Sequence, residues 1–380
     1  MKKVLVVLLI LAVAGGAFAQ ELKFNGTVRG GLSVIFTNND ADDVVLRQWN
    51  TREGYNSRFQ LTGAYTNAAG NAGFNTTLRW NNIMSGDPFD FSQAIPRAEA
   101  WFKILDGMIE IRGGYVDNET VFNTNGGWGS ALGSGVGGLG MQFNVNPING
   151  LNLRFVVAPG NSATSNSPGV AIWKASYRFG AVYTMADVFT ASALFRHTYQ
   201  TTDLGLGVRI LALKSAGFSI LGVDFGMENL GQKGASGSDF MTLHIGERIE
   251  WASGDLTIGG RFKQSFRLGG TGTYADKPDL TFSAFGQYVI KQIVPRLEVG
   301  FNIGQGIASN PRTGSYDAAL GFNGYKKDTM NLSISPTVQF RLPDANSYID
   351  LSYVLQAGFN PSGTKNNLRN TIAVNYGVNF

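Results

Sequence analysis

His197 and His244 are the two imidazole side chains of the chain, and it contains no cysteine. Hydrolytic enzymes usually place a His general base beside a Ser or a carboxylate, and zinc sites combine Cys and His. In the alternating pattern described below, His197 falls on an apolar face, whereas His244 shares a polar face with Thr242 and Arg248. We therefore expect no catalytic residue, no cofactor and no metal site, and we interpret His244 as part of a wall.

Basic residues form the more extensive chemical pattern. They recur at alternate positions of short segments and outnumber the acids that share their face. Arg and Lys side chains around a water-filled space favour anions. The alternative is that they pair with acids of the same face or of the loops and only stabilise the wall. The main candidates for this lining are Arg29, Arg58, Arg79, Arg112, Arg261 and Lys263.

Period-two alternation predicts the elements that position these residues. In the last thirteen residues, Leu368 to Phe380, apolar and aromatic side chains alternate with mostly polar ones, as on a β-strand with two different faces. The pair Tyr376 and Phe380 on this final strand resembles the C-terminal signal of bacterial outer-membrane barrel proteins. That resemblance implies that the barrel assembly machinery recognises the strand, which then closes the sheet against the first strand.

The same alternation recurs along nearly the whole chain. Short turns such as Asp106-Gly107, a strong hairpin signal, alternate with longer stretches such as 37–50 and 117–138 until about Ile290, where the alternation of lengths is lost. Short turns at one end and long loops at the other are typical of transmembrane barrels. We count about 19 segments, one of them at 316–324, and predict 16 or 18 strands because bacterial barrels have even numbers.

The first 19 residues predict a secretory signal peptide. Lys2 and Lys3 precede an apolar run, which ends in Ala17-Phe18-Ala19. The run is shorter than the roughly 20 apolar residues of a spanning helix, and no later stretch is long enough. The remaining chain, 20–380, shows no linker or composition shift, so we predict a single domain.

Composition narrows the class further. The chain has 50 glycines, 26 phenylalanines and 13 tyrosines but only 15% charged residues, which is unusual for a soluble protein. Without Lys2 and Lys3 the basic residues number 31 − 2 = 29 against 27 acids. This nearly neutral balance argues against nucleic acid as a partner, because nucleic-acid-binding domains are usually strongly basic.

One apolar face repeats through the chain, with little other material to cover it. Strands in a bilayer cannot leave backbone groups unpaired, so the sheet must close. We predict an all-β fold, a transmembrane antiparallel up-and-down β-barrel, with the apolar face toward lipid and the basic face around an aqueous channel. Glu247 departs from this pattern because it shares a face with Ile245 and Ile249. We expect it near a rim or at a slip in register.

Several stretches of the first third carry a family resemblance. They are K-F-N-G-T-V-R-G-G-L (23–32), N-S-R-F-Q-L-T-G (56–63), and P-R-A-E-A-W-F-K (96–103) followed by I-E-I-R-G-G-Y (109–115). Together with the last strand, they resemble the general porin superfamily of Gram-negative outer membranes. In that family a long loop after the fifth strand folds into the pore and sets its size.

The resemblance implies that the Gly-rich stretch 117–138 takes the place of this loop. Asp117, Glu119 and Trp128 are then candidates for the constriction, facing Arg58, Arg79 and Arg112. The stretch has few acids, unlike the familiar acidic loop, so we do not expect strong cation selection. An ordinary surface loop is the alternative interpretation of 117–138.

The resemblance further implies a porin of the cell outer membrane, exported by a cleaved signal peptide, in contact with lipid and passing small hydrophilic solutes by passive diffusion. Many porins of this style are homotrimers. We expect mild anion preference from the basic lining. The alternative function is a barrel that acts mainly as an adhesin or structural surface protein, because both functions need the same wall.

Overall fold

The computed structural model describes residues 21–37, 44–47, 57–81, 97–116, 138–158, 175–198, 201–228, 230, 241–268, 278–304, 329–342, 347–359 and 367–380. The predicted signal peptide, most of the stretch 117–138 and the predicted segment 316–324 lie outside the described residues. Among the described residues the one helix is the 3₁₀ turn η2 (Lys214–Ala216), and none of them forms a helix long and apolar enough to cross a membrane.

Nineteen strands account for nearly all of the described chain. In chain order they are β1 (Glu21–Thr37), β2 (Val44–Arg47), β3 (Ser57–Thr66), β4 (Ala72–Asn81), β5 (Arg97–Ile104), β6 (Ile109–Val116), β7 (Gly138–Ile148), β8 (Leu151–Ala158), β9 (Ser176–Met185), β10 (Phe189–Thr198), β11 (Thr201–Ile210), β12 (Phe218–Glu228), β13 (Met241–Ser253), β14 (Leu256–Leu268), β15 (Asp279–Tyr288), β16 (Ile293–Gly304), β17 (Thr329–Leu342), β18 (Ser347–Phe359) and β19 (Asn367–Asn379).

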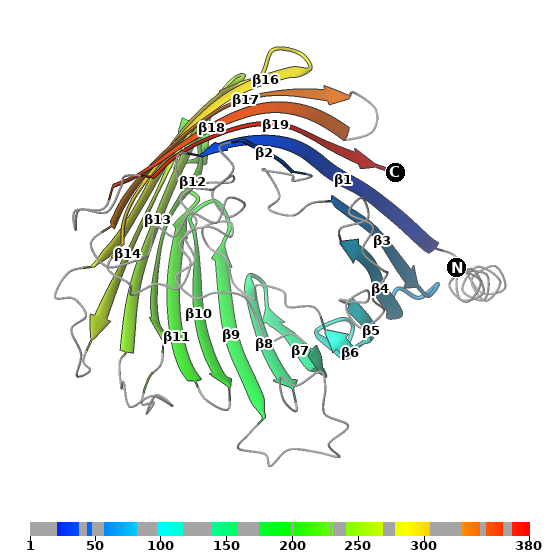
Figure 1. Cartoon of the computed structure of the whole chain (residues 1–380). Coiled ribbons are helices and arrows are strands. Elements are labelled where there is room, and N and C mark those ends of the chain that lie inside the picture. Colours follow the sequence, from blue (N-terminus) through cyan, green and yellow to red (C-terminus); the bar gives the residue numbers. More distant parts are fainter. Residues whose placement is uncertain are drawn as a thin grey trace.

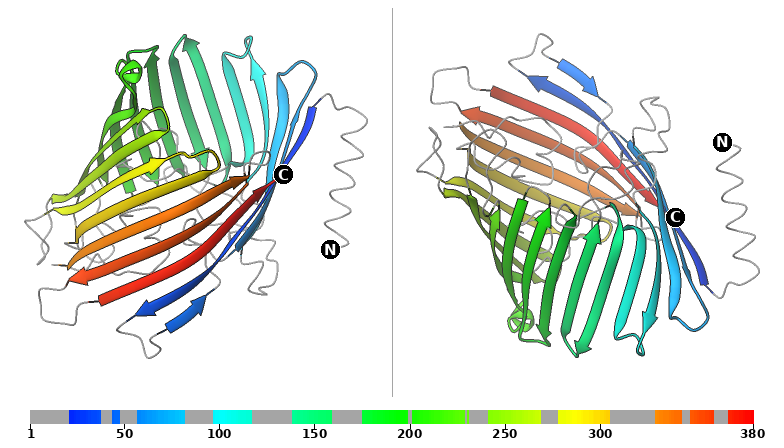
Figure 2. Two further views of the ribbon diagram at one scale, coloured as in Figure 1. Left: turned by 90° about the horizontal axis from the view of Figure 1, so that it is seen from above. Right: turned by 90° about the horizontal axis from the view of Figure 1, so that it is seen from below.

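These strands form one closed antiparallel sheet. Apart from β2, each strand pairs with the next in sequence, and β19 returns to pair with β1 from Thr27 to Thr37 (Figures 1 and 2). β3 pairs with β1 up to Gly30, and the short β2 continues along the same edge of β1 at Ser33–Phe36. Because β2 only prolongs this row, the wall has 19 − 1 = 18 spanning strands. The predicted up-and-down barrel and the larger of its two predicted strand numbers are confirmed.

Connection lengths alternate around the whole barrel. At one end all of them are short: 67–71, 105–108, 149–150, 186–188, 211–217, 254–255, 289–292 and 343–346. At the other end each connection between spanning strands has seven residues or more, except for the two-residue connection 199–200 between β10 and β11. The expected loss of alternation after Ile290 is therefore wrong. The predicted loop 37–50 also contains a strand, β2, because Val44 to Leu46 is a short apolar run that pairs with β1.

The predicted hairpin at Asp106-Gly107 is present. Leu105, Asp106 and Gly107 have φ of 51°, 54° and 86°, the left-handed backbone that the tight turns of hairpins use. The turn joins β5 to β6, the fourth and fifth spanning strands, and so fixes the register of a part of the wall that carries several candidate residues.

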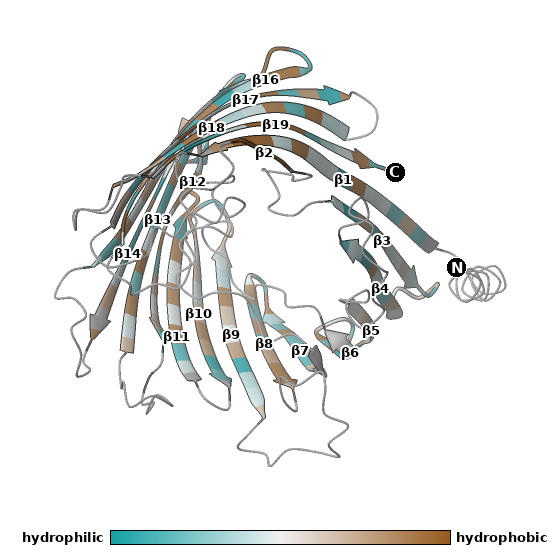
Figure 3. Ribbon diagram, in the orientation of Figure 1, coloured by the Kyte–Doolittle hydropathy of each residue, from teal (hydrophilic) through white to brown (hydrophobic). Residues whose placement is uncertain are grey.

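Polar and apolar residues are distributed inversely to those of a soluble protein. Most of the fully buried residues are polar, and large apolar side chains on nearly every strand are exposed. Figure 3 shows hydrophobic and hydrophilic positions alternating along the strands. Each strand therefore presents an apolar face outward and a polar face inward, as predicted. Glu247 is exposed on the outer face, and the β13–β14 pairing is continuous around it from Met241 to Ser253. The expectation that it lies near a rim or at a slip in register is therefore wrong.

The closing seam joins aromatic rings to glycines. Tyr376 lies directly opposite Gly30, and Phe380 exchanges two backbone hydrogen bonds with Gly26, N–O 2.6 and 2.9 Å. A Cβ atom on Gly30 would approach the Tyr376 hydroxyl oxygen to 2.6 Å, and one on Gly26 would collide with the Phe380 ring. The two residues of the predicted C-terminal signal thus occupy the space that these glycines leave on β1, as aromatic side chains do when they cover glycines in sheets.

Candidate functional site

The candidate lining residues can be assigned to a face by their cross-strand partners, because directly opposite residues share a face. Arg29 lies opposite Arg58, Arg79 opposite Gln60, and Arg112 opposite Trp101. Arg261 lies opposite Arg248, and Lys263 opposite Gly246. All six predicted lining residues belong to the polar, inward face. Of the loop candidates, Asp117, Glu119 and Trp128 lie outside the described residues.

Three pairs of arginines lie directly opposite each other on this inner face. They are Arg29 with Arg58, Arg178 with Arg196, and Arg248 with Arg261. Like charges in directly opposed positions destabilise a sheet. Such pairs concentrate positive charge at three places on the wall, where an anion or a nearby carboxylate offsets their repulsion.

Carboxylates offset part of this charge. Arg196 forms an ion pair with Asp203 (N–O 2.5 Å) and Arg296 one with Glu298 (2.9 Å). Arg248 pairs with Glu250, which also lies 3.9 Å from Arg261. By contrast, Arg58 Nε donates to the neutral amide of Asn81 (2.8 Å), and Arg79 Nε donates to that of Gln60 (3.0 Å). Basic side chains of the inner face are thus held by carboxylates on β10–β16 and by neutral amides at Arg58 and Arg79.

Arg112 is the centre of a network on β4 to β7. Its guanidinium contacts Glu99 (Nη1–Oε1 3.0 Å) and Glu110 (Nε–Oε1 2.6 Å). Asn75 donates to the same oxygen of Glu99 (3.1 Å), and Asn144 donates to Glu110 (2.9 Å). Two carboxylates thus hold one guanidinium against the wall, which fits the structural interpretation of a charged wall better than a free anion site.

Replacing Glu99 tests how acidic residues of the inner face offset its basic charge. Glu99→Gln should make the lining more anion-preferring, because it removes one negative charge while its amide oxygen can still accept from Asn75. In water one charge acts on an ion about 7 Å away with roughly 0.6 kcal/mol, so the permeability ratio should change by up to about threefold. The reversal potential in a KCl gradient measures this ratio. A shift toward cations would contradict the assignment of Glu99 to the lining.

An aromatic ring lies among the arginines of the opposite wall. Phe285 faces inward opposite Glu298, with the Arg296 guanidinium 4.1 Å and that of Arg261 5.9 Å from its ring centroid. Cation–π contacts of this kind hold guanidinium groups at a fixed height above a ring. Gln287 accepts from Arg296 as well (3.2 Å), so these two arginines have defined positions on the lining.

The inner face is not equally accessible around the barrel. Many inward side chains of β15 to β19 are almost completely buried, whereas Arg58, Arg79, Trp101 and Arg112 of β3 to β6 remain partly exposed. The buried set consists of Asp279, Thr281, Ser283, Phe285, Glu298, Asn302, Ser333, Ser335, Thr337, Asp350, Ser352, Val354, Gln356, Thr371, Ala373 and Asn375. Arg196 of β10 and Arg296 of β16 are exposed to about the same extent as Arg112, so the partly exposed basic residues are spread around the wall.

Four inward residues were missed by the sequence analysis. Asp203, Glu228 and Asp279 lie at or near the ends of their strands. The alternating pattern stops there, so it does not assign these residues to a face. Trp101 was hidden because a large aromatic residue interrupts the polar face of β5. Its indole lies next to Gly73 and 5.1 Å from the Lys103 ammonium. Its place between Glu99 and Lys103 in the alternation of β5 was the signal for its inward position.

Both histidines lie on the faces predicted for them. His197 is on the outer face, where Nδ1 lies 2.9 Å from Thr202 Oγ1. His244 is buried on the inner face, with Nδ1 2.7 Å from Ser265 Oγ and Nε2 3.2 Å from Glu228 Oε2. The three residues resemble a hydrolytic triad in composition only, because Ser265 is 2% exposed and cannot meet a substrate. No group of His, Cys, Asp and Glu among the described residues could hold a metal ion.

Comparisons with known proteins show where this barrel belongs structurally. Neither the known family models nor the curated proteins contain a match to the sequence. Solved structures do match over nearly the whole chain. OccAB3 of Acinetobacter baumannii has a TM-score of 0.62 at 13% identity, covering 95% of this chain and 99% of that one. Pseudomonas aeruginosa OpdQ has a TM-score of 0.57 at 11% identity, covering 96% of this chain and 99% of that one. P. aeruginosa OprD has a TM-score of 0.55 at 14% identity, covering 96% of this chain and 96% of that one. The chain shares the barrel fold of these outer-membrane proteins.

Proposed function

We propose that this protein is an outer-membrane porin through which small hydrophilic solutes diffuse passively, with a mild preference for anions. The observation that carries the proposal is the inverted wall: the outer face exposes large apolar side chains, as contact with lipid requires, and the inner face is polar and rich in arginine, as a water-filled channel requires. A closed barrel of this size encloses more space than its own side chains fill.

Two further observations support the proposal. The matching solved structures belong to the OprD and Occ porins of the outer membrane, and residues 1–19 have the pattern expected of an export signal. Arg58 on β3 and Arg79 on β4 donate to the neutral amides of Asn81 and Gln60, and Arg29 of β1 lies opposite Arg58, so basic side chains are concentrated on this part of the inner face.

Recording in planar lipid bilayers tests the function directly. Purified protein should give steady single-channel steps that are reproducible between preparations, with an anion-favouring reversal potential in a KCl gradient. Absence of conductance at high protein concentration, with the barrel still folded, would contradict the proposal and would favour an adhesin or structural surface protein.

The stretch 117–138 gives a second test. We propose that it folds into the pore, as its position after the fifth spanning strand suggests. Replacing it with a short turn between β6 and β7 should raise single-channel conductance severalfold, because a constriction dominates the resistance of a pore. Equal shortening of 305–328, between β16 and β17, is the control. Unchanged conductance in the first variant would remove 117–138 from the pore.

A further inference from the structure

Glu247 is the one acidic residue on the outward face of the described strands. It lies opposite Val223 of β12 and Phe262 of β14, and it is exposed. Six residues separate it from each end of β13 (Met241–Ser253), so it lies near the middle of the wall. A carboxylate at that depth on a lipid-facing surface is energetically costly. Acidic side chains in membrane proteins persist at such positions where they have a function.

Glu247 makes no hydrogen bond or ion pair with any described residue. Its own sheet offers it no basic side chain, since the outward residues on the neighbouring strands are apolar apart from Gln264. Arg248 and Arg261 are close in sequence and register, but they turn inward to Glu250. The carboxylate is therefore available to a partner that approaches from the membrane.

A hollow in the outer wall adjoins this carboxylate. It has a volume of about 530 Å³ and extends from β11 to β15, with Val208, Leu221, Ile249, Phe262 and Phe282 in its lining together with Glu247. Gly260 leaves part of the hollow open, because a Cβ there would meet nothing closer than 3.7 Å. The volume is within the range of sites for small molecules.

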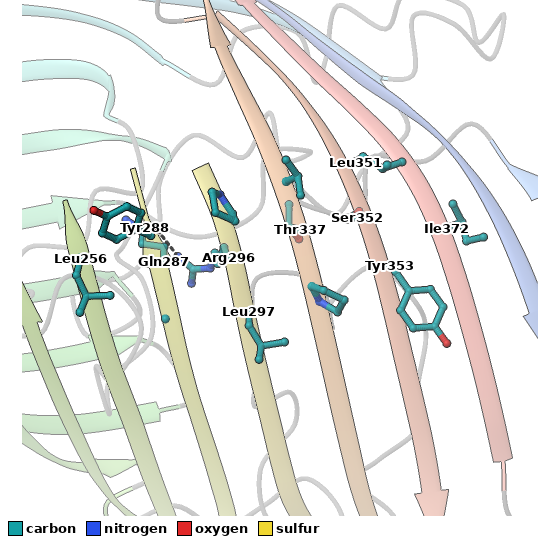
Figure 4. A pocket seen from close by; sticks show the side chains of 14 residues that line it. Leu256, Gln287, Tyr288, Arg296, Leu297, Thr337, Leu351, Ser352, Tyr353 and Ile372 are labelled. Atoms are coloured by element: carbon teal, nitrogen blue, oxygen red, sulfur yellow. Dashed lines mark hydrogen bonds between the residues drawn. The ribbon is translucent and has the colours of Figure 1, made fainter. Parts of the chain in front are cut away.

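A second outer hollow lacks this chemistry and serves as a comparison. It lies across β14 to β19 and is lined by apolar residues such as Leu256, Leu297 and Ile372 (Figure 4). Its one charged residue, Arg296, directs its guanidinium inward to Phe285 and Glu298. Arg248 and Arg261 line the hollow beside Glu247 in the same way, with their guanidinium groups at inward Glu250. The two hollows therefore differ in the outward carboxylate of Glu247.

We propose that the hollow beside Glu247 is a lipid-side binding site for an amphiphilic amine, a molecule with an apolar body and one cationic nitrogen. The apolar body fills the space above Gly260, and the ammonium donates hydrogen bonds to the Glu247 carboxylate. Charge-assisted hydrogen bonds of this type are strong where water is excluded. The site lies outside the channel and does not depend on the proposed function.

Native mass spectrometry from phosphatidylcholine nanodiscs tests the site, because these lipids carry no primary amine. With dodecylamine as the probe, we expect one retained amine per barrel. Glu247→Gln, which keeps the shape of the side chain, should lower its occupancy at least tenfold. Gly260→Leu should lower it too, since it fills the hollow and leaves the carboxylate in place. Dodecanol, with the same chain and no charge, should not be retained.

The control variant is Glu110→Gln, which removes a carboxylate from the inner face and should leave the occupancy unchanged. Equal retention of dodecylamine by the wild type and Glu247→Gln would overturn the proposal. So would a loss of binding in Glu110→Gln instead, which would place the amine in the channel. Retention of dodecanol equal to that of dodecylamine would show that the hollow takes up apolar chains without regard to charge, and would also overturn it.

Discussion

The double substitution Gly26→Val and Gly30→Val should prevent most of the protein from closing its barrel. Each valine would meet an aromatic ring of β19, Phe380 at Gly26 and Tyr376 at Gly30, and the Phe380 ring also lies 6.5 Å from that of Phe59. Overpacking of this kind costs about 1–3 kcal/mol per site. Two adjacent sites on one seam therefore remove a large part of the stability of a typical domain.

Heat-modifiable migration on gels and the urea midpoint of unfolding measure this effect. Gly113→Val on β6 is the matched control, since Gly113 also faces outward and a Cβ there would meet nothing within 4 Å. Valine at that position should be neutral or stabilising by up to about 1 kcal/mol, because it favours strands. Adding Tyr376→Ala to Gly30→Val should recover part of the loss. Equal behaviour of the seam variant and the Gly113 control would exclude the clash as the cause.

Neutralising Arg58, Arg79 and Arg112 together, each to Gln, should lower the anion-to-cation permeability ratio about fivefold. These residues are partly exposed on the inner face, and three charges screened by salt act on a passing ion with roughly 1 kcal/mol in total. The reversal potential in a KCl gradient should move toward the cation side, and the difference from wild type should shrink at high salt.

A control with the same change of total charge separates the lining from the rest of the molecule. Lys214 and Lys291 are exposed residues at the short-turn end of the barrel. Their double replacement by Gln should move the reversal potential far less than the double replacement of Arg58 and Arg79 does. Equal shifts in these two double variants would show that selectivity follows net charge and that the arginines have no special place in the pore.

Much of the fold was predictable because alternation assigns every mid-strand residue to a face. Arg58, Arg112 and Arg261 needed only the period of two, and each is on the predicted inner face. What alternation cannot give is register. The opposition of Arg29 to Arg58, and of Trp101 to Arg112, depends on how neighbouring strands slide past one another, and no pattern within a single strand determines that sliding.

Residues at strand ends were less predictable for a related reason. Asp203 and Asp279 begin or nearly begin their strands, so they have polar connections on one side and too few alternating neighbours on the other. The four-residue β2 is shorter than most strands and was hidden in a polar stretch. Glu247 shows the converse case. The pattern placed it correctly on the outer face, and the expectation that it lies near a rim or at a slip in register was wrong.

Every neighbouring pair of spanning strands except one is joined by a direct connection, and the exception is β1 with β19, at opposite ends of the chain. Their pairing needs the longest loop closure in the molecule, and once it is made no spanning strand can leave without breaking two ladders at once. Chains dominated by distant pairings form slowly. Unfolding and refolding in denaturant should therefore follow different curves on ordinary laboratory timescales. The width of this hysteresis would measure the kinetic barrier to opening and closing the sheet between β1 and β19.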